Sequence, residues 1–205
     1  MKFTFAADSK PLIAADHLLV LVHQEDLGPR KQLLAKLSKL LTKPLAELAV
    51  QLGKEASVGL LGGNATSLTA KGNRITVGVL PSKISRHATE ACAESVRKLT
   101  AAAGLRNGGK NAVLLMLRDE GHSLASCNAV GRALPDFTLK SRSKSTGSLA
   151  IACALPNGKL LRTDATTKDI VQRAREAARF VDAPPTDLDP AAFATAAKKL
   201  LRAVP

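Results

Sequence analysis

The end of the chain, residues 166–205, reads TTKDIVQRAREAARFVDAPPTDLDPAAFATAAKKLLRAVP. Thr166 and Asp169 have the Ser/Thr-x-x-acid spacing of a capping box, which predicts that a helix begins there. The apolar positions that follow recur with helical periodicity, while the arginines and Glu176 fall on the other side of the predicted helix. Asp169 precedes Arg173 by four residues, which is the favourable orientation for an ion pair along a helix.

A double proline divides this stretch into two helices. Pro184 and Pro185 lack amide hydrogens and favour extended geometry in the residues before them, so the first helix must end near Asp182. Asp189 then supplies an N-cap, and Pro190 occupies the first position of a second helix. The apolar residues of that second helix are Phe193, Ala197, Leu200 and Leu201.

The segment around the double proline resembles a junction found in one protein family. RFVDAPPTDLDPAAFA (179–194) is similar to the segment through which a linker helix enters the catalytic domain of leucyl aminopeptidases. Two further segments resemble the "probable aminopeptidase-like" branch of that family, VGVLPSKISRHATEA (77–91) and LASCNAVGRALPDFTLKS (124–141). The resemblance is patchy over residues 77–205 and weak before them.

The resemblance implies a division of the chain into three parts. Residues 1–163 are expected to form an amino-terminal α/β domain, residues 164–183 a linker helix, and residues 184–205 the beginning of a catalytic domain whose remainder is absent. The family's metal-binding segments, of the types VGKG-x-TFDSGG and NTDAEGR, do not occur in this sequence. A two-metal hydrolytic site needs clustered oxygen ligands. We therefore expect no catalytic, metal-binding or cofactor-binding residue in this chain.

The resemblance also implies what the parent protein does. Leucyl aminopeptidases of this family are homohexamers that remove amino-terminal residues from peptides with two divalent ions, commonly zinc or manganese. Those two ions are expected in the missing catalytic domain. The expected partners of this chain are that catalytic domain and the other subunits of the oligomer. The chain itself is expected to be inactive and to contribute to oligomer assembly and to active-site access.

Composition places the chain in an intracellular, cytoplasmic class. No apolar run is long enough to cross a bilayer, because PLIAADHLLVLV (11–22) is short and is interrupted by Asp16 and His17. The first ten residues, MKFTFAADSK, lack the layout of a secretory signal and are typical of an edge strand. Cys92, Cys127 and Cys153 are widely spaced, which indicates buried thiols in a reducing compartment rather than a metal site.

The formal net charge of +13 leaves a second function open, a standalone basic α/β module that binds nucleic acid or a nucleotide. The basic residues are nevertheless spread out, which favours solvated faces: Arg30, Lys31, Lys36, Lys39 and Lys43; Lys140, Arg142 and Lys144; Arg173, Arg175 and Arg179. A third alternative is a shortened paralogue that acts only as an assembly partner of full-length subunits.

Two short motifs suggest chemistry but favour a structural interpretation. LLGGN (60–64) could cradle a phosphate, yet its glycines lie between expected strands, so a turn at Gly62-Gly63-Asn64 is predicted instead. Ser85 and His87 are a nucleophile and a base close together in sequence, but no acidic partner is evident. We interpret Ser85 as a helix cap and the Arg86-His87 pair as structural or interfacial.

The order of expected elements predicts an α/β fold: a three-layer mixed sheet flanked by helices, with an architecture related to macro domains. Expected strands lie at 2–6, 18–22, 58–61, 66–70, 75–80, 112–117, 137–139, 148–155 and 160–162. Expected helices lie at 29–41, at 44–52 before a closing Gly53, at 86–103 before Gly104, and from a cap at Asp119 to about 133. A polar basic loop is expected at 141–148.

Overall fold

The structure is a computed structural model that describes residues 1–28, 33–84, 86, 89–105, 108–134 and 147–201. The strand expected at 137–139 and most of the loop expected at 141–148 lie outside the described residues, as do Ser85 and His87. Among the described residues, no helix combines the length and hydrophobicity that crossing a lipid bilayer requires.

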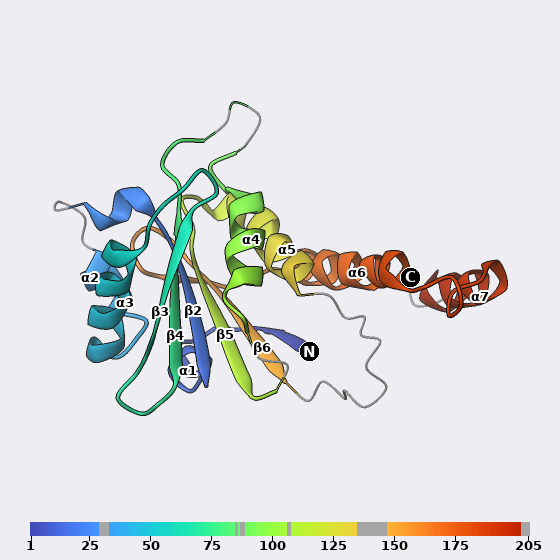
Figure 1. Ribbon diagram of the computed structural model, residues 1–205, viewed down its shortest axis with the longest axis horizontal. Coiled ribbons are helices and arrows are strands. Elements are labelled where there is room, and N and C mark those ends of the chain that lie inside the picture. Colours follow the sequence, from blue (N-terminus) through green and yellow to red (C-terminus); the bar gives the residue numbers. More distant parts are fainter. Residues whose placement is uncertain (29–32, 85, 87–88, 106–107, 135–146, 202–205) are drawn as a thin grey trace.

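One mixed sheet forms the centre of the domain (Figure 1). The described strands are β1 (Lys2–Phe5), β2 (His17–His23), β3 (Gly63–Leu68), β4 (Arg74–Leu80), β5 (Lys110–Met116), β6 (Ser148–Ala154) and β7 (Leu160–Leu161). Their order across the sheet is β1-β6-β5-β2-β4-β3, and β7 pairs with the end of β6. The pairs within β1-β6-β5-β2-β4 are parallel, whereas β3 and β7 run antiparallel to their neighbours.

Helices cover both faces of the sheet, which confirms the predicted three-layer α/β architecture. The described helices are α1 (Lys10–Ile13), η1 (Gln24–Leu27), α2 (Leu33–Leu37), α3 (Lys43–Glu55), α4 (Ala93–Ala102), η2 (Glu120–His122), α5 (Ser123–Ala133), α6 (Ala165–Asp182) and α7 (Pro190–Leu201). Because side chains alternate along a strand, Leu18 and Val20 of β2 pack with α1, α2 and α3, while Leu19 and Leu21 pack with α4 and α5.

Several local predictions are confirmed. β1 is an edge strand, and β5 lies inside the sheet between β6 and β2. The hairpin between β3 and β4 turns through Gly72, whose φ of 78° suits a residue without a side chain. Asp119 accepts a hydrogen bond from the Gly121 amide at 2.8 Å, where the helical segment η2–α5 begins. Asp189 likewise accepts from the Ala192 amide at 2.7 Å and caps α7, which starts at Pro190.

The helix predicted at 29–41 is shorter than expected in the described residues. α2 ends at Leu37, and the Leu40 and Leu41 amides both donate to the Leu37 carbonyl as the chain turns. This turn buries Leu40 and Leu41 in the core and lets α3 begin at Lys43, whereas Leu34 is exposed. Periodicity alone cannot separate a continuous helix from a helix followed by a turn that buries the same leucines.

The predicted helix start at Arg86 and the predicted helix end at Gly53 are also wrong. α4 begins only at Ala93, because Cys92 has a left-handed φ of 47° and its amide closes a turn onto the Thr89 carbonyl. Gly53 lies inside α3 rather than after it. A Cβ on Gly53 would come within 2.8 Å of the Leu27 side chain, so this glycine allows close packing rather than ending the helix.

The turn predicted at Gly62-Gly63-Asn64 lies slightly earlier in the chain. Gly59 and Gly62 exchange two backbone hydrogen bonds around Leu60 and Leu61, and β3 starts at Gly63. A strand therefore follows the glycines, whereas a phosphate-cradling loop needs a helix N-terminus at that point.

Candidate functional site

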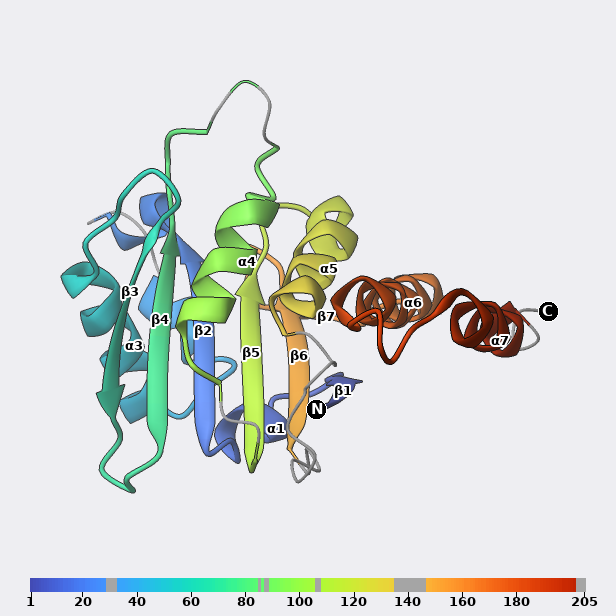
Figure 2. The ribbon, with the colours of Figure 1, turned by 45° about the vertical axis from the view of Figure 1, so that its right-hand side comes forward.

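The chain's most distinctive surface is the helical arm formed by α6 and α7. Figures 1 and 2 show α6 leaving the domain beside α5, with α7 beyond it. Asp164 caps α6, since its carboxylate accepts hydrogen bonds from the Thr167 amide and hydroxyl, each at 2.7 Å. The capping box predicted at Thr166 and Asp169 is therefore wrong by two residues, although the predicted ion pair between Asp169 and Arg173 is present at 3.4 Å.

α6 is anchored to the domain as far along as Arg175. Val171 is buried, and its Cγ1 lies so close to Gly131 of α5 that a Cβ there would approach it to 3.1 Å. Arg175, predicted on the solvated side of the helix, is only 4% exposed. Its guanidinium lies 3.7 Å from the centre of the Phe3 ring, so a cation–π contact with β1 holds this arginine.

The rest of the arm is much more exposed. α6 ends at Asp182, as the double proline predicts, and Val181 is 86% exposed. No described residue of α7 is buried. The rings of Phe180 and Phe193 pack edge to face, with their centres 5.5 Å apart, and this contact joins the two helices. Between the helices lies a groove with a volume of about 730 Å³. Both helices and the segment that connects them line this groove: Arg173, Glu176, Arg179, Phe180, Ala183, Asp187, Leu188, Ala192, Ala196, Lys199 and Leu200.

A cluster of polar side chains lies where the central parallel strands β2 and β5 end. His23 closes β2 and is buried next to Arg118, which forms an ion pair with Glu25 at 2.6 Å. Burial, and to a smaller extent the charge of Arg118, lower the pKa of His23 to about 4, against the opposing effect of Asp26 and Glu25. A cavity of only about 10 Å³ adjoins His23, Arg118 and His122, which is too small for an organic ligand.

The low pKa of His23 predicts a loss of stability in acid. The unfolded histidine has a pKa of about 6.5, so the unfolded chain binds the extra proton between about pH 6.5 and pH 4. The free energy of unfolding should therefore fall over this window, by up to about 3 kcal/mol from His23 alone. Denaturant unfolding at pH 7 and pH 4.5 should show a smaller fall for His23→Gln than for the native chain. An equal fall in both proteins would contradict this account.

The three cysteines are free and buried, as predicted. The Sγ atoms of Cys127 and Cys153 lie 3.5 Å apart between α5 and β6. Their mutual hydrogen bond and their burial raise the pKa of the Cys127 thiol, and burial also raises the pKa of Cys92. Thiols in this state are poor nucleophiles and poor metal ligands at neutral pH.

The described residues do not fit a two-metal centre. No group of three or more His, Cys, Asp or Glu side chains that could hold a metal ion occurs among them. His122 and Cys127 belong to the consecutive elements η2 and α5 and form no part of such a group. We therefore assign no catalytic step to these residues.

Several of the basic side chains already have partners. Lys36 pairs with Asp26 at 3.4 Å, Lys39 donates to the Asn157 carbonyl at 3.0 Å, and Lys43 lies 4.0 Å from Glu47. In α6, Arg173 contacts both Asp169 and Glu176. Arg30, Lys31, Lys140, Arg142 and Lys144 lie outside the described residues.

The architecture thus defines a class: an α/β domain with a helical arm, in which the described residues form no cluster of metal-binding side chains. The family model for "M17 aminopeptidase N-terminal domain 2" matches residues 26–143. The chain belongs to this family and is an amino-terminal domain of the M17 leucine aminopeptidases. No curated protein matches the sequence.

Solved leucyl aminopeptidases share the fold over nearly the whole chain. The Leishmania major leucyl aminopeptidase, solved in complex with actinonin, is 25% identical with a TM-score of 0.75, over 96% of this chain and 38% of that one. A Trypanosoma brucei M17 aminopeptidase is 21% identical with a TM-score of 0.69, over 95% of this chain and 38% of that one. The Caenorhabditis elegans leucine aminopeptidase is 16% identical with a TM-score of 0.67, over 97% of this chain and 40% of that one. The chain therefore spans well under half the length of each.

Proposed function

We propose that this chain is the noncatalytic amino-terminal part of a metal-dependent leucyl-type aminopeptidase that removes amino-terminal residues from peptides. In this proposal residues 1–163 form the amino-terminal domain, residues 164–183 the linker helix, and residues 184–205 the start of the catalytic domain. Two divalent ions, zinc or manganese, belong to the catalytic domain. The parent protein works in the cytoplasm as a homohexamer, and the domain contributes to assembly and to active-site access.

The observation that carries this proposal is the exposure of the helical arm. α6 is anchored at its beginning by Val171 and Arg175, yet its end and all described residues of α7 lack burial. Val181, Phe193 and Leu201 are 86%, 48% and 70% exposed. An amphipathic helix gains most of its stability by burying its apolar side, so the arm is suited to pack against further protein. The limited coverage of the solved leucyl aminopeptidases supports a catalytic domain as that further protein.

The proposal predicts that the purified 205-residue chain does not hydrolyse leucyl-amide substrates, with or without added manganese. The reason is that no cluster of metal ligands forms among its described residues. The release of the chromogenic amine measures this directly, and a full-length M17 aminopeptidase in the same buffer serves as the positive control. Metal-dependent turnover that co-purifies with the chain through two different columns would refute the proposal.

The net charge of +13 favours a second candidate, a basic module that binds nucleic acid or a nucleotide. Its affinity should weaken steeply with salt concentration, because phosphate contacts release counterions. A titration that detects no binding at low salt would remove this candidate. The third candidate, a shortened assembly partner, requires that the chain co-purify with a full-length aminopeptidase oligomer.

A further inference from the structure

A partly enclosed cavity of about 270 Å³ lies on the sheet face opposite to α4, α5 and α6. Its walls come from three places: α1 and the start of β2, the start of α3, and the turn of the β3–β4 hairpin. The walls are mostly aliphatic, with contributions from Leu12, Ile13, Leu18, Leu45 and Leu48. This volume lies just below the range of pockets that hold drug-sized ligands, so it suits a smaller molecule.

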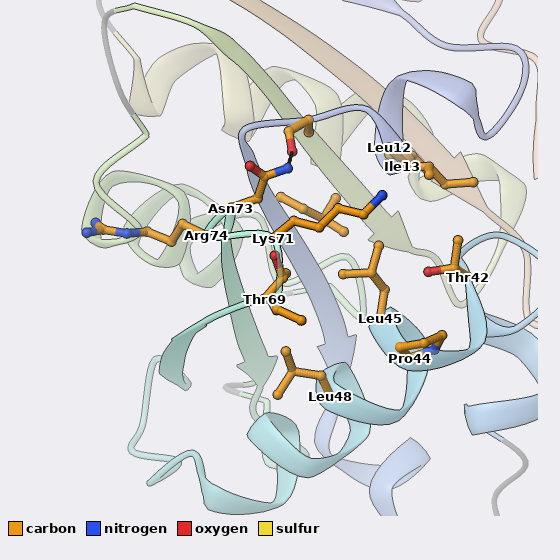
Figure 3. Close-up of a pocket in the computed structure, with 13 residues that line it drawn as sticks. Leu12, Ile13, Thr42, Pro44, Leu45, Leu48, Thr69, Lys71, Asn73 and Arg74 are labelled. Carbon is orange, nitrogen blue, oxygen red and sulfur yellow. Dashed lines mark hydrogen bonds between the residues drawn. The ribbon is translucent and has the colours of Figure 1, made fainter.

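The polar side chains of the cavity come from the β3–β4 hairpin and from Thr42, the residue before α3. Figure 3 shows the Lys71 side chain extending over Leu45 toward Ile13, whereas Arg74 points away from the leucines. Thr69 lies beneath Lys71, and its hydroxyl is buried with no hydrogen-bond partner among the described residues. Because this hydroxyl has almost no accessible surface, a ligand in the cavity cannot reach it, whereas the Lys71 side chain is exposed.

The turn that carries Lys71 and Thr69 is held in place by its own contacts. The Thr69 amide donates a hydrogen bond to the Asn73 carbonyl at 2.8 Å, and the Gly72 amide donates to the Thr69 carbonyl at 2.8 Å. The Asn73 side chain donates to the Ala15 carbonyl at 3.2 Å and ties the turn to the segment between α1 and β2 (Figure 3). The cavity is thus formed before any ligand binds, which lowers the entropic cost of binding.

We propose that this cavity binds a small aliphatic carboxylate. The aliphatic part would lie against Leu45 and Leu48, and the carboxylate would pair with the Lys71 ammonium. Such a group occurs in medium-chain fatty acids and at the carboxyl terminus of peptides that end in an aliphatic residue. The cavity is built from α1, α3, β2 and the β3–β4 turn and does not involve the helical arm, so this proposal is independent of the proposed function.

The test is isothermal titration calorimetry of the full 205-residue chain with octanoate, N-acetyl-leucine and octylamine. At least one of the two carboxylates should bind with a dissociation constant of about 1 mM or lower, and octylamine should not. Tighter binding of octanoate identifies the fatty-acid source, and tighter binding of N-acetyl-leucine identifies the peptide source.

Two variants and one control connect binding to the cavity. Lys71→Gln should weaken carboxylate binding about two- to fivefold, the worth of one exposed ion pair. Leu45→Trp should abolish binding by filling the cavity, with thermal unfolding used to show that the variant is folded. Lys98→Gln removes the same charge from α4 on the opposite face and should leave the affinity unchanged.

Clear results would overturn the proposal. The proposal fails if neither carboxylate binds at millimolar concentration. It also fails if octylamine binds as tightly as octanoate. Unchanged affinity in a folded Leu45→Trp variant would place any binding elsewhere. An equal loss of affinity in Lys71→Gln and Lys98→Gln would mean that the net charge of the chain attracts the carboxylate, without a specific contact to Lys71.

Discussion

Gly63→Ala is expected to lower the free energy of unfolding by about 3 kcal/mol or more. Gly63 opens β3 opposite Val79, and the preceding connection passes directly over it. A Cβ at this position would lie only 1.9 Å from the Ser57 carbonyl oxygen and 3.3 Å from the Val58 Cα. Both of these atoms belong to the backbone, so no side-chain rotation can relieve the clash. The chain between α3 and β3 would have to move away from the sheet.

Thermal unfolding followed by circular dichroism measures this effect. A loss of about 3 kcal/mol corresponds to a fall in Tm of about 6–12 °C for a domain of this size. Gly108→Ala is the matched control, because a Cβ at Gly108 meets no atom within 4 Å. The control should change the Tm by no more than about 2 °C. A native-like Tm for Gly63→Ala would show that the connection yields more easily than its contacts indicate.

Leu114→Ala should lower the free energy of unfolding by about 2–5 kcal/mol. Leu114 lies in β5 between β6 and β2, has no exposed surface, and packs with the core beneath α1, α2 and α3. Truncation removes apolar contacts on all sides, and strands on both flanks prevent the cavity from collapsing.

Equilibrium denaturation in urea gives this value directly, since a pure loss of stability shifts the midpoint without changing the slope. Leu60→Ala is the control, because Leu60 is 94% exposed at the turn between Gly59 and Gly62. It should change the free energy by less than about 0.5 kcal/mol. Equal losses in the two variants would mean that β5 is not part of the stable core.

The fold was predictable where its signals are local. The strands β2, β5 and β6 are short runs of mostly apolar residues, and the β3–β4 hairpin has Gly72-Asn73 between two expected strands. Caps at Asp119 and Asp189 depend on a side chain reaching an amide two or three residues away. Each of these features depends on residues that are close together in the sequence, so each could be predicted from the sequence alone.

Two of the wrong predictions concern residues whose contacts are with distant parts of the chain. Helical periodicity predicts that Arg175 faces solvent, but Phe3, at the other end of the sequence, provides the ring on which it stacks. Glycine after an apolar run predicts a helix end at Gly53, but Gly53 lies inside α3, where it allows the Leu27 side chain to pack closely. The left-handed Cys92 shortens the helix predicted from Arg86, and no local residue signal predicts that conformation.

The candidate sites divide in the same way. The double proline and the capped helix after it revealed the helical arm, because proline limits the backbone wherever it occurs. The cavity beneath Lys71 could not be predicted, since its walls come from α1, α3 and a hairpin turn that only the folded sheet brings together.

The α/β class, the double-proline junction and the family resemblance can all be predicted from the sequence, because backbone constraints and apolar periodicity are properties of neighbouring residues. The strand order, the burial of Arg175, the exposure of α7 and the cavity beside Leu45 become visible only in the folded domain. These features arise from contacts between residues far apart in the chain, and such contacts exist only once the sheet has formed.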